Sequence, residues 1–503
     1  MKKVVVILCI LSLIAMVGWK LTEGWRKDRQ RTDLLIETSD LRDFDKVVTV
    51  WGDDWLGYLI FRSRHFQRIL EAKGIGYKFE QKLDFKERFN GLSNGGCDIV
   101  LGTIDSYLVN GGDAGYAGVI TFVIDESFGG DAIVGKPGLT SLDDLNKPEI
   151  KGAFVGFSPS EFLLKSQISH FKLDQLLPNV TKFRVDSAEA AHQKLVDGAV
   201  DFAVLWEPMT SAALRDLKGS QRLIDTSQVR GVIIDVGVAS RTLVRDDPEK
   251  LQTVIEAYFE TLHYYFANSD ELHQLASSDQ NSGGDMLAGI EFAGIEDNRA
   301  LTGLADGGSS GRDLLDRIND ISNILVDVGD LSSDPFGGNA RAIVNSRFLQ
   351  RVKIQGATSG SGKLTASRYY RALSDADWDE LSRKMTGTLI DKPITFGVGQ
   401  STIGEEFQED LQEAAKKLEH YPKHRVIIQA HVSAGTNPEQ DIELSQQRAE
   451  AIKQFLVGAG TASERVLAKG RGSSEPVAKV AGEGNRAWKR RCRRAKIFIA
   501  PER

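Results

Sequence analysis

Cysteine is scarce in this 503-residue sequence, which contains only three. Cys9 lies in an apolar leader, Cys97 in a predicted strand and Cys492 in a basic run, so the three share no metal-ligand spacing. The sequence therefore predicts no disulfide framework and no cysteine-bound metal. A chain with so few cysteines fits either the cytoplasm or a periplasmic protein that does without bridges.

Catalytic signatures are missing as well. The sequence has no serine–histidine–acid set and no zinc spacing, and His65, His170 and His192 lie in predicted helices as surface or packing residues. The segment "ATSGSGKL" (357–364) lacks the first glycine and the metal-binding hydroxyl of a phosphate loop, so a flexible segment explains it better. We predict that the chain is not an enzyme and needs no cofactor or metal ion.

A strong charge of either sign is also absent. The net charge of −7 over 503 residues predicts no general affinity for nucleic acid. Hydrophobic residues make up 41% and charged residues 26%, which is ordinary for a folded protein, and the length is enough for two or three domains. The function classes that remain are those of a folded binding or structural protein.

Long apolar runs are absent except for one, Val4–Trp19, which follows Met1-Lys2-Lys3. It is slightly shorter than the roughly 20 residues of a spanning helix, although the Lys20 side chain can reach the membrane surface. The residues after the run match a signal-peptidase site poorly. We therefore favour an uncleaved signal anchor over residues 1–22, with a cleaved signal as the alternative. The basic residues that follow argue against export of that side.

Beyond a polar linker at residues 23–45, short predicted helices alternate with apolar strands. In "DFKERFNGLSNGGCDIVLG", Asp84 and Glu87 have capping-box spacing, and a strand begins at Cys97 after a glycine pair. In "DSAEAAHQKLVDGAVDFAVLWEP", we expect Asp186 to cap a helix that precedes a buried strand at Ala199–Leu205. This alternation predicts an α/β unit with mainly parallel sheets.

A series of segments in this unit has a distinctive order and spacing. It includes "WGDDWLGY" (51–58), "GCDIVLGTID" (96–105), "GFSPSEFLL" (156–164) and "DGAVDFAVLWEP" (197–208). Over residues 46–353 the chain resembles the two-lobed periplasmic solute-binding proteins of the nitrate, taurine and alkanesulfonate group. The resemblance implies a two-lobed fold with a ligand cleft between the lobes. A second linker is expected at residues 354–392.

Candidate ligand contacts lie where predicted strands end and helices begin. Ser158 and Ser160 stand at a helix start, where free backbone N–H groups attract a negative group, although both serines could simply cap the helix. Trp55 and Tyr58 could form an apolar wall for a ligand or could pack within their own lobe. Each of these pairs is a candidate half of one site.

Acidic residues are frequent at the predicted rim of the cleft. Trp206 and Glu207 end a strand there, and the other rim carboxylates are Asp53, Asp54, Asp105, Asp125, Asp131 and Asp235. Most loop aspartates cap helices or are solvated. If even two point inward, a purely anionic ligand such as nitrate is disfavoured. We therefore predict a small polar solute, zwitterionic or sulfonate-like, with any amine near a carboxylate.

The last unit, residues 393–503, is predicted in βαβαβ order. It contains "HVSAGTNPEQDIELSQQRA" (431–449) and the turn "GRGSSEP" (470–476). This unit resembles an OmpA-like peptidoglycan-binding domain, a small α+β fold. The resemblance implies wall-binding roles for His431, Asp441, Leu444 and Arg448, whereas Ser433 stands where the family has an aspartate.

The missing aspartate bears on how the loop would hold peptidoglycan. The family resemblance implies that the aspartate holds the amine of diaminopimelate while an arginine holds its carboxylate. Arg448 can supply a bidentate carboxylate contact, but Ser433 carries no charge. Asp441 could turn toward the amine, although capping its own helix suits it better. We expect binding that is weakened, or shifted to a wall peptide presenting mainly a carboxylate.

The whole chain is thus predicted to combine a two-lobed α/β unit, a small α+β domain and one N-terminal membrane helix. It would be a single-pass inner-membrane protein with its bulk in the periplasm, tethered a second time to peptidoglycan. Its expected partners are a small solute, the wall, the membrane and a transporter permease or signalling protein. The alternative is a structural spacer with a vestigial cleft. A stator subunit is disfavoured because Val4–Trp19 has no ionisable residue.

Overall fold

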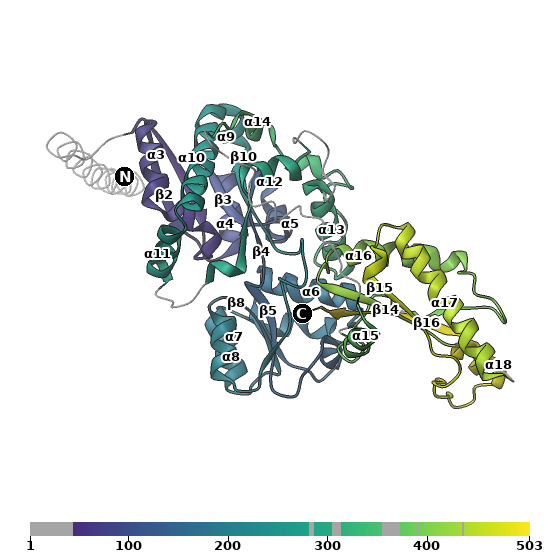
Figure 1. Ribbon diagram of the computed structural model, residues 1–503. Coiled ribbons are helices and arrows are strands. Elements are labelled where there is room, and N and C mark those ends of the chain that lie inside the picture. Colours follow the sequence, from purple (N-terminus) through teal and green to yellow (C-terminus); the bar gives the residue numbers. More distant parts are fainter. Residues whose placement is uncertain are drawn as a thin grey trace, which may run out of the picture.

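The computed structural model describes most of the chain in three units (Figure 1). The described residues are 44–280, 286–303, 313–354, 373–385, 387–390, 392–434 and 437–502. The predicted membrane helix at residues 1–22 lies outside them, as does the linker 23–45 except for its last two residues. Among the residues that are described, no helix is long and apolar enough to cross a membrane.

The first lobe is built on a six-stranded sheet in the order β11-β4-β10-β3-β1-β2. Its strands are β1 (Lys46–Gly52), β2 (Ile75–Gln81), β3 (Ile99–Thr103), β4 (Gly118–Ser127), β10 (Ile234–Ser240) and β11 (Ile290–Phe292). β1 pairs in parallel with β2 and β3, whereas β10 runs antiparallel to β3 and β4. β3 and β4 are buried along their whole length, because helices cover both faces.

Two layers of helices enclose this sheet. One face packs on α2 (Leu59–Arg62), α3 (Arg64–Ala72), α10 (Pro248–Ala267), α11 (Ser269–Gln280) and α14 (Arg347–Arg351). The other packs on α4 (Phe85–Asn94), α5 (Ile104–Asn110) and α13 (Leu314–Asp327). The short helices α9 (Arg241–Asp246) and α12 (Ile295–Leu301) follow β10 and β11.

The second lobe has a five-stranded sheet in the order β7-β6-β8-β5-β9. Its strands are β5 (Asp131–Gly135), β6 (Gly152–Val155), β7 (Arg184–Val185), β8 (Phe202–Trp206) and β9 (Gln221–Asp225). Helix α6 (Pro159–Phe171) covers one face, and α7 (Ala188–Val196) and α8 (Met209–Asp216) cover the other. Every residue of α6 after Pro159 is buried, so this helix is enclosed on all sides.

Two details of the sequence reading change in these lobes. Asp84 does cap α4, but Ser187 rather than Asp186 caps α7, because its hydroxyl accepts the N–H of Ala190. The prediction of mainly parallel sheets is wrong, since both sheets are mixed. The reason is the crossing between lobes: β4 runs out toward the second lobe and β10 returns from it, so the two must be antiparallel.

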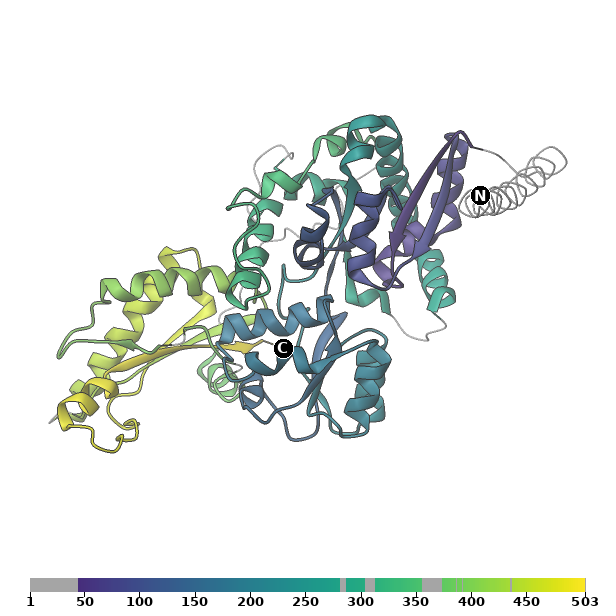
Figure 2. The same ribbon diagram turned by 180° about the vertical axis from the view of Figure 1, so that it is seen from behind.

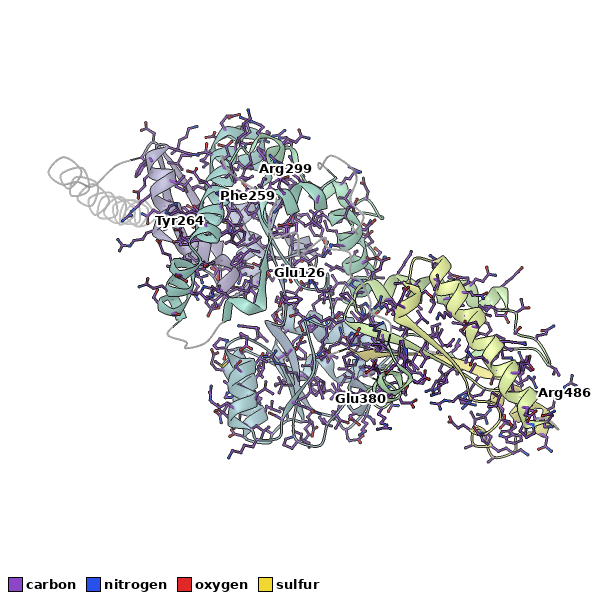
Figure 3. All side chains as sticks on the ribbon, viewed as in Figure 1. Glu126, Phe259, Tyr264, Arg299, Glu380 and Arg486 are labelled. Carbon is purple, nitrogen blue, oxygen red and sulfur yellow. The ribbon has the colours of Figure 1, made fainter. Side chains whose placement is uncertain are left out.

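Two chain segments connect the lobes, residues 128–130 between β4 and β5 and residues 226–233 between β9 and β10. Glu126, at the end of β4, lies where the lobes meet (Figure 3). Its carboxylate is buried and accepts hydrogen bonds from Arg230 at 2.7 and 3.1 Å and from Gly231 N at 2.7 Å, while Arg317 of α13 lies 3.2 Å away. The Glu126 carboxylate therefore joins the end of β4, just before the first connection, to Arg230 and Gly231 in the second.

The third unit has the sheet order β12-β16-β14-β15, with β13 also paired to β16. Its strands are β12 (Gly387–Thr388), β13 (Ile394–Thr395), β14 (His424–Ala430), β15 (Val466–Gly470) and β16 (Arg494–Pro501). Helices α16 (Gln408–Glu419) and α17 (Pro438–Gly458) pack on one face, and α18 (Asn485–Cys492) leads into β16.

Part of the predicted linker 354–392 belongs to this third unit. Helix α15 (Asp375–Leu381) buries Trp378 and Leu381 against Ile427 and Ala500 on the open face of the sheet. β12 adds a strand beside β16. The sheet therefore takes its second cover from the segment read as a linker, and the predicted βαβαβ order also misses α18.

The third unit packs on the second lobe and on the lobe connections, and it lies to one side of both lobes in the two views (Figures 1 and 2). The buried Tyr421 hydroxyl lies 2.6 Å from His170 Nδ1 and donates to Gln167 Oε1 at 3.1 Å, both on α6. Two contacts join His420 to the backbone of Arg230. Arg230 N donates a hydrogen bond to His420 O at 2.5 Å, and the side-chain Nδ1 of His420 lies 2.6 Å from Arg230 O. Lys423 sits 4.3 Å from the ring of Phe128. The turn at residues 420–423 thus touches both connections.

Candidate functional site

A hollow of about 420 Å³, partly open to solvent, lies between the two lobes. The first lobe lines it with residues at the ends of β1 and β3 and in β10, the second with residues at the starts of α6 and β5 and at the end of β8. The lining residues are Asp53, Asp54, Trp55, Tyr58, Phe85, Thr103, Asp131, Pro159, Trp206, Ile233 and Asp235. Strand ends that face another lobe are the expected place for a ligand in an open α/β fold.

Two carboxyl groups of the first lobe stand opposite each other on neighbouring strands. Asp235 of β10 is the register partner of Asp125 of β4. The Tyr58 hydroxyl donates to Asp235, and Trp55 Nε1 donates to Asp125 Oδ1 at 3.4 Å. Gly57 allows the backbone to approach Asp125 closely, because a Cβ at this position would lie 2.0 Å from Asp125 Oδ2. The two aromatic residues therefore position this carboxyl pair.

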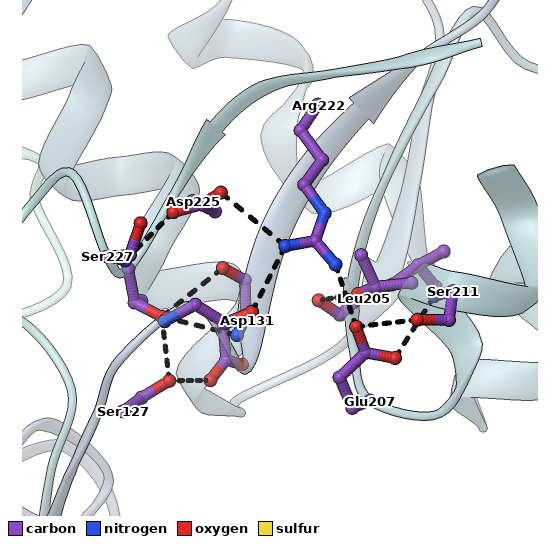
Figure 4. Close-up of polar contacts among 11 residues, drawn as sticks. Ser127, Asp131, Leu205, Glu207, Ser211, Arg222, Asp225 and Ser227 are labelled. Atoms are coloured by element: carbon purple, nitrogen blue, oxygen red, sulfur yellow. Dashed lines mark hydrogen bonds and ion pairs between the residues drawn. The ribbon is translucent and has the colours of Figure 1, made fainter. Parts of the chain in front are cut away.

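Two further carboxyl groups complete a buried acidic cluster, which we define as Asp105, Asp125, Asp131 and Asp235. Asp131, at the start of β5, accepts the Ser127 hydroxyl at 2.7 Å (Figure 4). Asp105 follows β3 in the first turn of α5. All four are at least 97% buried. One oxygen in each of two members, Asp105 Oδ1 and Asp125 Oδ2, lacks a hydrogen-bond partner among the described residues.

Basic residues do not compensate this cluster. No lysine or arginine is among the described residues that line the hollow. The nearby Arg88 pairs with Asp53 at 2.9 Å and donates to Lys82 O and Leu101 O. Burial accordingly raises the pKa of Asp105 and of Asp131 to about 7 and that of Asp125 to about 8, and it raises the pKa of Asp235 well above its usual value.

The other predicted cleft residues are placed differently. Glu207 does not line the hollow: its carboxylate accepts Arg222 at 2.8 Å and Ser211 at 3.0 and 3.1 Å (Figure 4). The Ser158 hydroxyl donates to Val155 O at 2.7 Å. Ser160 is fully buried beside the lining residue Pro159, and its hydroxyl has no partner in the described part of the chain. Ser160 alone of this set retains a group for a ligand.

The start of α6 is also less suited to an anion than its sequence indicates. The Glu161 carboxylate accepts the N–H of Phe157 at 2.8 Å, and it pairs with Lys165 at 2.5 Å and with Arg184 at 2.6 Å. One N–H group at this helix start is therefore already taken by the protein's own carboxylate. Phe85 and Thr103, which line the hollow, were missed by the sequence reading, and both follow directly from the strand-end rule that found their neighbours.

In the third unit, Arg448 is fully buried, and the protein already uses its donors. The guanidinium donates to Gln400 O at 2.8 Å, Gly397 O at 2.8 Å and His431 O at 3.1 Å. Burial, with the neighbouring charge of Arg493, lowers the pKa of Arg448 to about 10. The residue therefore ties the loop before α16 to the end of β14.

The remaining loop residues lie around the start of α17. Asn437, not Asp441, caps this helix, because its side chain accepts the N–H groups of Glu439 and Gln440. Asp441 instead accepts the Ser473 hydroxyl at 2.7 Å. Ser433, which precedes α17, and Leu444, which lies in that helix, are both half-buried. The interpretation of Asp441 as the helix cap is wrong, since the helix begins at Pro438, one turn earlier than expected.

Positive charge surrounds His431. The histidine is 4% exposed, and burial followed by the charge of Arg494 lowers its pKa to about 4, so it is neutral at pH 7. His431 Nδ1, Arg471 Nε and Arg494 Nη1 are buried without a hydrogen-bond partner among the residues described. Arg471 and Arg494 were not predicted; the turn "GRGSSEP" and the basic run before β16 are the signals that could have found them.

Comparisons with known proteins identify the third unit. Residues 395–490 match the OmpA family. The chain is 32% identical over 102 residues to outer membrane porin F of Pseudomonas fluorescens, covering 20% of this chain and 31% of that protein. It is 31% identical over 85 residues to the peptidoglycan-associated lipoprotein of Brucella melitensis, covering 17% and 51%. The chain thus spans about a third to a half of the length of these curated relatives.

A solved structure is similar to the two lobes. It is the periplasmic aliphatic sulphonate binding protein SsuA from Escherichia coli, which matches 61% of this chain and 97% of its own at 14% identity and a TM-score of 0.43. An identity this low carries no information about the ligand. The chemistry of the cleft has to be derived from the side chains that line it.

Proposed function

We propose that this chain, a two-lobed α/β protein whose residues 395–490 form an OmpA-family domain, is a solute receptor of the cell envelope that is held to peptidoglycan. In this proposal the cleft binds a small polar solute, and the chain catalyses no reaction. One observation carries the proposal: the buried carboxyl groups of Asp131 and Asp235 line a hollow between two lobes, and their neighbours Asp105, Asp125 and Ser160 each keep a polar atom without a partner among the described residues. Such groups are costly unless a ligand satisfies them.

The cleft supports a receptor better than the spacer alternative. A structural spacer has no reason to keep carboxyl groups buried and unpaired, because each destabilises the fold. A purely anionic, sulfonate-like solute is not the ligand that this geometry favours, since Asp131 and Asp235 line the hollow and no described lining residue carries positive charge. The polar solute of the proposal therefore brings a group that donates hydrogen bonds.

Wall binding rests on the OmpA-family match and on the donors around His431. Arg471 and Arg494 offer unpaired N–H groups that suit a carboxylate of a wall peptide. Ser433 supplies no charge for an amine. The wall ligand that fits best therefore presents mainly a carboxylate. Anchoring in the inner membrane by residues 1–22, and delivery of solute to a permease or signalling partner, complete the proposal.

Two measurements on the full chain test this function. Native mass spectrometry of protein purified from envelopes should detect a small molecule bound in one-to-one ratio. Purified sacculi should retain the protein, and an excess of soluble wall peptide should release it. A chain that carries no small molecule from any growth medium, yet still binds sacculi, would support the spacer instead.

A further inference from the structure

The solute can be narrowed further from the charge of the hollow, an inference that rests on the function proposed above. Asp131 faces the hollow from the second lobe and Asp235 from the first. Asp105 and Asp125 lie buried behind them, each with an unpartnered oxygen. Closing the lobes on a ligand thus brings it between carboxyl groups on both sides.

The apolar part of the hollow is aromatic. Trp55, Tyr58, Phe85 and Trp206 line it, and three of these belong to the first lobe. Aromatic faces attract a positively charged group, and they also cover the hydrocarbon of a small ligand. Four rings and four carboxyl groups, those of Asp53, Asp54, Asp131 and Asp235, share one lining, which suits a cation attached to a short carbon chain.

A bare metal ion is a poorer fit. Among the described residues, no three histidine, cysteine, aspartate or glutamate side chains converge closely enough to hold one. The rings that share the lining with the carboxyl groups also offer a bare metal ion no ligand atoms. An ammonium group supplies both a positive charge and up to three N–H donors.

We propose that the hollow binds a small organic ammonium ion, whose N–H groups donate to Asp131 and Asp235 while its carbon chain lies among Trp55, Tyr58 and Trp206. In this proposal the buried Ser160 hydroxyl, next to the lining residue Pro159, contacts a polar group at the other end of the ligand. A carboxylate at that end would find no lysine or arginine among the described lining residues, so an amino alcohol fits better than an amino acid.

Titration calorimetry on the full chain tests the charge with probes that share a four-carbon chain. The probes are 4-aminobutan-1-ol, 4-aminobutyrate, butan-1-ol and butane-1-sulfonate. The amino alcohol should bind about tenfold or more tightly than the neutral alcohol, since a charged hydrogen bond is lost in the latter. The zwitterion should bind less tightly than the amino alcohol, and the sulfonate should not bind.

Variants assign the binding to the hollow. Asp131→Asn and Asp235→Asn should each weaken the amino alcohol by about tenfold or more, because the charge is removed and the shape retained. Asp297→Asn is the matched control: Asp297 is buried and caps α12 outside the hollow, so the affinity should stay unchanged. Should Asp235→Asn fail to fold, Asp131→Asn in the other lobe gives the same comparison.

Three results would overturn the inference. Binding of butane-1-sulfonate in place of the amines would show an anion receptor and leave the proposed function standing. Equal affinity for the alcohol and the amino alcohol would show that charge is not recognised. Binding of no probe, while native mass spectrometry still finds a bound molecule, would reject the ammonium ligand alone; the absence of both would reject the receptor function as well.

Discussion

The cleft and the third unit differ in whether the protein supplies partners for its buried charged groups. In the cleft, four carboxyl groups share one region, and the described chain brings no lysine or arginine to the hollow they border. In the third unit, Arg448 of α17 is equally buried, but three backbone carbonyls accept its N–H groups. The protein thus provides hydrogen-bond partners for Arg448, whereas Asp105 and Asp125 each keep an oxygen without a partner among the described residues.

This difference separates a structural residue from a binding residue without any reference to family. A buried charge whose donors are all used fixes the fold, whereas one with unused acceptors awaits a partner. By the same criterion, Arg471 and Arg494, whose side chains retain unpaired donors among the described residues, are the residues that we propose for the wall ligand. Four experiments test this contrast, and they follow from the largest expected effect to the smallest.

Removal of the satisfied cation should have the largest effect. Arg448→Ala should destabilise the OmpA-family domain by about 3–5 kcal/mol, because three backbone carbonyls, one of them in a fully buried hydrogen bond, lose their donor and a cavity opens. Urea denaturation followed by domain-specific fluorescence measures this change. Arg490→Ala, an exposed arginine of the same domain, should shift the stability by less than about 0.5 kcal/mol. Equal, small effects would show that Arg448 is free for a ligand after all.

Ionisation of the buried carboxyl groups in the cleft should make the ligand-free protein less stable as pH rises. A carboxyl group with a raised pKa binds more protons in the folded chain, so its stabilising contribution is complete below about pH 4 and is lost as pH rises through 7 to 8. The asparagine in Asp125→Asn has no proton to lose. As pH rises, the free energy of unfolding of this variant should therefore increase relative to that of the wild type by on the order of 1.4 kcal/mol per pH unit.

Chemical denaturation at pH 5 to 9 measures that gap between the two proteins. Asp246→Asn provides the control, because Asp246 is exposed and its pKa is lowered by the hydrogen bond from Arg245. The control gap should stay flat over this range. A flat gap for Asp125→Asn too would mean that the cleft carboxylates are already compensated.

Restoring an acid to the loop should sharpen the contrast between the two sites. Ser433→Asp supplies the missing partner for an amine and should raise retention on sacculi by about tenfold, the value of one charged hydrogen bond. Ser433→Asn matches its size without the charge and should leave retention near the wild-type level. Equal gains for the two variants would attribute the effect to size rather than charge.

The smallest effect is expected between the two regions. Tyr421→Phe removes a hydroxyl that bonds to His170 and Gln167, which should weaken the packing of the third unit on α6 by about 1 kcal/mol. Hydrogen exchange of α6 in the full chain should then become faster. Tyr264→Phe removes a more exposed hydroxyl bond, to Glu271, and serves as the control. Unchanged exchange would show that the hydroxyl adds nothing to this interface.

Local patterns predicted much of the fold. Alternating helices and strands predicted an α/β unit, the family resemblance implied its two lobes, and Asp84 caps α4 as the capping-box spacing predicted. The direction of strands could not be predicted, because it depends on the chain crossing twice between lobes. Nor could α15, since Trp378 finds its burial against β14 and β16, more than forty residues away.

The ends of strands predicted which residues line the hollow, whereas hydrogen-bond partners from other elements could not be predicted; binding by these residues stays a prediction. Trp55, Tyr58, Asp131, Trp206 and Asp235 all line the hollow. Glu207 ends β8 as expected, but Arg222 and Ser211 take its carboxylate. That outcome depends on contacts between β8, β9 and α8, and no spacing in the sequence records them.

The position of the turn at residues 420–423 has a mechanical consequence. It rests on Phe128 and Arg230, one in each connection about which the lobes would rotate as they close on a solute. If the third unit is held to the wall as proposed, tension would enter the two lobes close to their axis, where its lever arm is short and its torque small. A receptor fastened in this way would be pulled by the wall without being pulled open.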